Sequence, residues 1–70
     1  MIDVFVRLVP LPTHVEGLTV PNNDETYSVY INSLLCDRMQ HSALRHELQH
    51  IKKNHLYDNR SIRVVEAEAG

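Results

Sequence analysis

The chain has 70 residues, enough for one small domain at most, so residues 1–70 are predicted to form a single unit. Seven Lys and Arg residues against nine Asp and Glu residues give a formal charge of −2, which argues against a nucleic-acid-binding surface. A core of this size is marginal without a metal, disulfides or a partner. The single cysteine, Cys36, excludes an intramolecular disulfide, so a metal or a partner is expected.

The N-terminal segment carries no basic stretch before its apolar run, so it does not have the pattern of a signal peptide. No stretch of the sequence approaches the ~18 apolar residues of a membrane span. Together with the lone cysteine, these features predict a cytoplasmic protein without membrane association.

The first half of the sequence has the period of β-strands. Apolar residues alternate through 2–9, a second short strand is predicted at 18–20, and aromatic and β-branched residues alternate through 27–32. Turn-forming residues separate the last two segments, at 21–24. The simplest assembly is a three-stranded antiparallel sheet in which 27–32 is a candidate edge strand for binding an extended peptide.

The period changes to that of an α-helix over 37–55. Asp37 is a candidate N-cap, with Gln40 three residues later as in a capping box. At 100° per residue, apolar side chains share one arc that predicts the core face, namely Leu44, Leu48 and Ile51. His46 and His50 fall on a neighbouring arc, at the rim of that face.

The tail predicts a short second helix that begins near Ser61. Ile62, Val65, Glu66 and Ala69 fall at helical spacing, although the β-branched residues in this segment lower helix propensity. An α+β fold follows, with a three-stranded antiparallel sheet, one long helix and a short C-terminal helix.

The motif His46-Glu47-x-x-His50 is the strongest chemical signal in the chain. Residues four apart lie one turn above each other on a helix, so both imidazoles can bind one Zn²⁺. Glu47 is offset by one residue, where it can act as the general base for an attacking water. A solvated, histidine-rich helix face is the alternative explanation.

A catalytic zinc needs a third protein ligand. On a helical tail Glu66 would share the face of Ile62 and Val65, whereas Glu68 would point away, so Glu66 is the predicted third ligand. Three further residues are candidates for donating a hydrogen bond to an oxyanion or, alternatively, have structural roles. These residues are Tyr30, His55 and Tyr57. Cys36 is expected to be a small buried apolar residue.

The order YSVYINS, HELQH and VEAEA, at 27–33, 46–50 and 65–69, resembles the ImmA/IrrE family of small zinc metallopeptidases, in particular its short phage- and mobile-element-type members. The resemblance implies a minimal zincin-like domain with a short sheet and an HExxH helix. It also implies zinc ligands His46, His50 and Glu66, and Glu47 as general base. Gln49 stands where the family usually has glycine.

What the resemblance implies about function is cleavage of a protein substrate, such as the helix-turn-helix repressor of a phage or mobile element. The alternative is a zincin-like module that binds and regulates a partner protein without cutting it. A DNA-binding helix-turn-helix is disfavoured by the acidic charge. The sequence leaves the oligomeric state open.

Overall fold

The computed structural model describes residues 1–55 and 60–66. In this part of the chain, four strands and one helix follow in the order β1 (Ile2–Val9), β2 (Gly17–Pro21), β3 (Tyr27–Asn32), α1 (Asp37–Asn54) and β4 (Ile62–Glu66). The three predicted strands and the long predicted helix are therefore confirmed, to within a residue or so at their ends.

The sheet is mixed, with the order β2-β3-β1-β4, so the prediction of a three-stranded antiparallel sheet was wrong. β2 pairs antiparallel with β3, whereas β1 runs parallel to both of its neighbours, β3 and β4. β3 and β4 are joined by α1, the crossover that parallel strands require. Because β3 lies between β2 and β1, the prediction that Tyr27–Asn32 is an edge strand was also wrong; the edges are β2 and β4.

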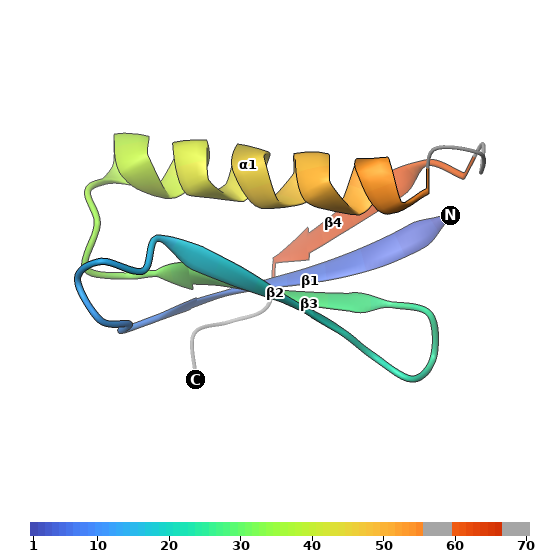
Figure 1. The fold of residues 1–70 in the computed structure, drawn as a ribbon, viewed down its shortest axis with the longest axis horizontal. Coiled ribbons are helices and arrows are strands. Elements are labelled where there is room, and N and C mark those ends of the chain that lie inside the picture. The colour runs from blue at the N-terminus through green and yellow to red at the C-terminus, as the bar shows by residue number, and fades with distance from the viewer. Residues whose placement is uncertain (56–59, 67–70) are drawn as a thin grey trace.

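The helix lies along one face of the sheet (Figure 1). It packs on β3 and β2, at one side of the sheet. The buried core combines alternate residues of β1 and β3 with two residues of α1, namely Ile2, Val4, Val6, Val29, Ile31, Ala43 and Ile51. Leu44 and Leu48 pack against this core, which confirms the predicted core face of α1. Burial of each large aliphatic side chain stabilises the fold by about 1.5–3 kcal/mol before entropy is counted.

The start of α1 differs from the predicted capping box. Cys36, in an extended conformation with φ −66° and ψ 162°, occupies the N-cap position, and it makes no side-chain cap hydrogen bond. Asp37 is the first helical residue, where its negative charge still favours the positive end of the helix dipole. The Gln40 side chain donates instead to the carbonyl of Leu35, at 2.8 Å. Cys36 is exposed rather than buried, which contradicts the expectation from its apolar character.

The predicted C-terminal helix was wrong, because Ile62–Glu66 forms β4. Without β4, the side of β1 that faces away from β3 would lack a hydrogen-bonding partner, and the β-branched residues of this segment favour a strand there. The register Asp3↔Arg63 places an acid beside a base, and the Arg63 guanidinium donates two hydrogen bonds to the Asp3 carboxylate, at 3.0 and 2.8 Å. These bonds and the charge of Asp3 raise the pKa of Arg63.

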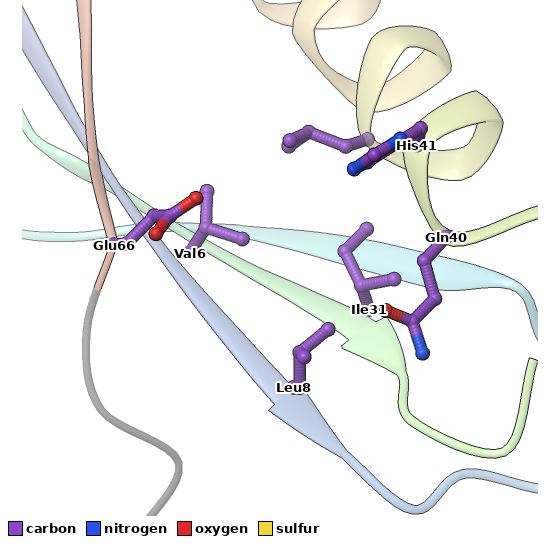
Figure 2. Close-up of a pocket in the computed structure, with 7 residues that line it drawn as sticks. Val6, Leu8, Ile31, Gln40, His41 and Glu66 are labelled. Carbon is purple, nitrogen blue, oxygen red and sulfur yellow. The ribbon is translucent and has the colours of Figure 1, made fainter. Parts of the chain in front are cut away.

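Glu66, the last residue of β4, lines a cavity of about 200 Å³ between α1 and the sheet (Figure 2). The cavity floor is apolar, with Val6, Leu8 and Ile31, and the side of α1 contributes Gln40, His41 and Leu44. The rest of the predicted helical tail, 67–69, lies outside the described residues.

Candidate metal centre

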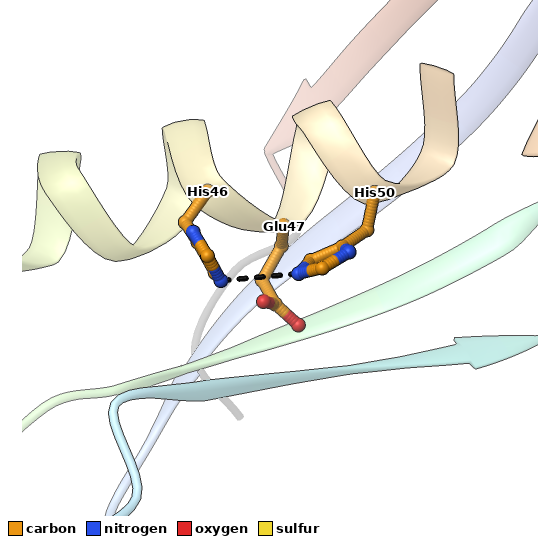
Figure 3. A group of neighbouring side chains, drawn as sticks. All are labelled: His46, Glu47 and His50. Carbon is orange, nitrogen blue, oxygen red and sulfur yellow. Dashed lines mark hydrogen bonds between the residues drawn. The ribbon is translucent and has the colours of Figure 1, made fainter. Parts of the chain in front are cut away.

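His46, Glu47 and His50 project together from α1 toward β2 (Figure 3). The two imidazole rings stand edge to face, with centroids 4.6 Å apart and an interplanar angle of 86°. Their Nε2 atoms are 3.0 Å apart and share a hydrogen bond. One ligand atom from each of the three residues lies within 4.8 Å of the others, and this is the metal-compatible group that the described residues contain. The helical spacing thus places the motif as the sequence predicted.

The donor atoms fit a tetrahedral zinc ion. Two nitrogen ligands at about 2.0–2.1 Å from Zn²⁺ are separated by about 3.3 Å when the angle between them is tetrahedral. The observed Nε2–Nε2 separation of 3.0 Å requires only a small outward turn of the rings. Both histidines are exposed, so such a turn meets no packed core. The residues present therefore match the chemistry that a zinc ion needs from its first two ligands.

Glu47 is held by the edge strand opposite it. The Thr19 hydroxyl donates a hydrogen bond of 3.0 Å to Glu47 Oε1. Residue 17 is glycine where β2 begins beside β3: a Cβ atom there would lie 3.0 Å from Ile31 Cδ1 and from the Tyr30 carbonyl oxygen, whereas its distance of 3.6 Å from Glu47 Cγ on α1 is an ordinary contact. The hydrogen bond from Thr19 thus orients the half-buried Glu47 carboxylate beside the two imidazoles.

An open groove of about 580 Å³ adjoins this group. One wall is α1, with Ser42, Ala43, His46 and Glu47, and the other is the loop that leads into β2, with His14, Val15, Glu16 and Gly17. Two of the three motif side chains, His46 and Glu47, therefore line the groove.

The structure does not bring Glu66 together with the histidine pair. Glu66 ends β4, at the edge of the sheet opposite β2, and it lines the cavity of Figure 2 rather than the groove. The metal-compatible group found within residues 1–55 and 60–66 does not include it. The difference follows from the tail, which was expected to be a helix and pairs with β1 as a strand.

The candidate oxyanion donors occupy separate places. His55 Nε2 is 2.7 Å from the Tyr27 hydroxyl, and the two rings meet edge to face. Tyr30 lies on β3 between Val29 and Ile31, which are buried under α1, so strand alternation directs it to the opposite face of the sheet. Tyr57 and Glu68 lie outside the described residues.

Three residues at the site were not singled out from the sequence: His14, Thr19 and Asn32. Thr19 contacts Glu47, and His14 lines the same groove as the motif, because of the pairing of β2 with β3, which no local pattern predicts. Asn32, which ends β3, is fully buried, and this could have been anticipated only from its position in an otherwise apolar, alternating strand.

Comparisons of the chain with protein-family models, with curated proteins and with solved structures found no match. In the part of the chain that the structure describes, no helix is long and apolar enough to cross a membrane.

Proposed function

We propose that the chain is a zinc-dependent endopeptidase of the ImmA/IrrE type, in which His46 and His50 bind the metal and Glu47 is the general base. The observation that carries the proposal is the convergence of these three side chains beside an open groove. The resemblance of HELQH and its flanking segments to the family supports the same conclusion.

In this proposal, separate residues bind the metal, transfer the proton and orient the base. His46 and His50 would hold a Zn²⁺ ion, which would supply Lewis-acid polarisation of the scissile carbonyl and increase the acidity of the attacking water. Glu47 accepts the proton of the attacking water and can return it to the leaving amine. The hydrogen bond from Thr19 keeps the Glu47 carboxylate turned toward the groove during this transfer.

The edge strand β2 is the natural place for a substrate backbone. It borders the groove through Gly17, and it is an edge of the described sheet. An extended peptide added to this edge would form main-chain hydrogen bonds and pass beside Glu47. The substrate would be a protein segment in extended form, such as a linker of a helix-turn-helix repressor from a phage or mobile element.

A non-catalytic module that binds a partner protein is the second candidate. The metal-compatible group within the described residues has two imidazoles and one carboxylate, and the predicted third ligand, Glu66, lines a different cavity. A site with two protein ligands would still bind metal weakly, and the β2 edge would still bind a peptide.

Glu47→Gln separates the two functions. The change keeps the size of the side chain but removes the group that accepts the proton, so a peptidase should lose cleavage by at least about 100-fold. Co-expression with repressors encoded in the same genetic neighbourhood, with fragments detected by immunoblotting, measures the loss. Binding of the repressor by Glu47→Gln should persist, since β-augmentation uses backbone groups.

Glu25→Gln is the matched control, because the same chemical change then falls on the exposed β2–β3 turn, where Glu25 pairs with Arg60. It should cut as the wild type does. Repressor binding without fragments from any of the three proteins would reject the peptidase and leave the binding module.

A further inference from the structure

The third protein ligand of the proposed zinc site has no obvious source. A catalytic zinc has three protein ligands and an open position. His46 and His50 supply two, and Glu66 lines the cavity at the other side of the helix. The following inference rests on the proposed metal site and concerns the residue that completes it.

The loop between β1 and β2 presents an imidazole to the same groove. Its tip is a turn in which the Val15 N–H donates to the Pro12 carbonyl, at 2.8 Å. His14 is the third residue of that turn, is exposed, and lines the groove together with His46 and Glu47. A turn closed in this way holds the backbone of His14 in place while its side chain can rotate.

A buried asparagine fixes this loop to the end of β3. Asn32 has no exposed surface, and it is the buried polar side chain that the described residues contain. Its Nδ2 donates to the carbonyls of Leu11, Pro12 and Val15, at 3.2, 3.3 and 2.9 Å, and its Oδ1 accepts from the Leu11 and Leu34 N–H groups. A loop tied to a buried side chain at both of its ends has a defined position beside α1.

We propose that His14 is the third zinc ligand. Three neutral imidazoles with one open position are an established donor set for catalytic zinc. The ring of His14 lies outside the compact group of ligand atoms formed by His46, Glu47 and His50. Its exposed side chain turns into the groove when the ion binds, while Asn32 keeps the loop backbone where it is. Glu16 of the same loop also lines the groove, but His14 is the residue that would complete a set of three imidazoles, a known donor set of catalytic zinc.

The test is zinc affinity, measured by competition with a chromophoric chelator at neutral pH, for wild type, His14→Ala, His50→Ala and His41→Ala. His41 is the control, because it is an exposed histidine on α1 that lines the other cavity. His14→Ala should weaken binding roughly 10- to 100-fold, as a lost ligand or its immediate support does. His41→Ala should bind as the wild type does.

A second readout is the His14 ring resonances in the NMR spectrum of the wild-type protein, which should shift in step with those of His46 when Zn²⁺ is added. If the wild type takes up zinc and His14→Ala matches His41→Ala, the role of His14 is overturned while the proposed metal site stands. If the wild type takes up no zinc, both the role of His14 and the proposed metal site are rejected. His14→Gln, which keeps a side chain of similar reach at this exposed turn, should reproduce the weaker binding.

Discussion

The two sides of α1 serve different purposes. Toward β2, the helix presents imidazoles and a carboxylate to an open groove, and the facing strand supplies a hydroxyl that orients the carboxylate. Toward β4, it presents Gln40, His41 and Leu44 to a smaller cavity with an apolar floor, at which Glu66 is the one carboxylate among the lining residues.

The difference shows how a very small protein can carry a polar site without losing its core. The apolar arc of α1 packs on the sheet, while the motif occupies the neighbouring arc at the edge of the packed face. The histidines remain exposed, so placing them there costs little desolvation free energy. The metal-compatible group thus lies beside the packed face of the helix and not within it.

The largest effect within this comparison is expected from Asn32→Ala, which would release the loop that forms the outer wall of the groove. The change removes a fully buried side chain and its hydrogen bonds to the Leu11 N–H and to the carbonyls of Leu11 and Val15, so the free energy of unfolding should fall by about 2–4 kcal/mol. Urea denaturation followed by circular dichroism measures this free energy. Asn23→Ala, at an exposed turn position, is the control and should stay within about 0.5 kcal/mol of wild type. Equal stability of the two variants would show that the network does not hold the loop.

Glu66→Gln should have little effect on zinc affinity, and this result would separate the two sides of α1. Glu66 lies in the apolar cavity and not with the histidines, so zinc affinity should change by less than roughly two-fold. Competition titration against the wild type measures the ratio. A loss of affinity as large as that of His50→Ala would mean that β4 approaches the motif in the zinc-bound protein, as the resemblance to the ImmA/IrrE family implies.

What the sequence predicted well depends on neighbours along the chain. The helix and the spacing of His46 and His50 follow from local periodicity, as do the strands at 2–9 and 27–32.

What the sequence did not predict depends on pairing between distant segments. The tail matches a helical period at Ile62, Val65 and Glu66, yet the free edge of β1 makes it a strand. That pairing also moves Glu66 away from the motif. The same kind of contact brings Thr19 to Glu47 and ties the loop around His14 to Asn32, two features that no local pattern contains.

The most direct test of the account is the amount of zinc bound per chain, by equilibrium dialysis of wild type and of the double variant His46→Ala/His50→Ala at neutral pH. The wild type should hold close to one Zn²⁺ per chain, and the double variant, with circular dichroism unchanged, should hold none at the same free zinc concentration. Lowering the pH should release the metal, because the imidazole nitrogens that bind zinc must be unprotonated. Failure of the wild type to take up zinc, or equal uptake by the double variant, would contradict the assignment of the site.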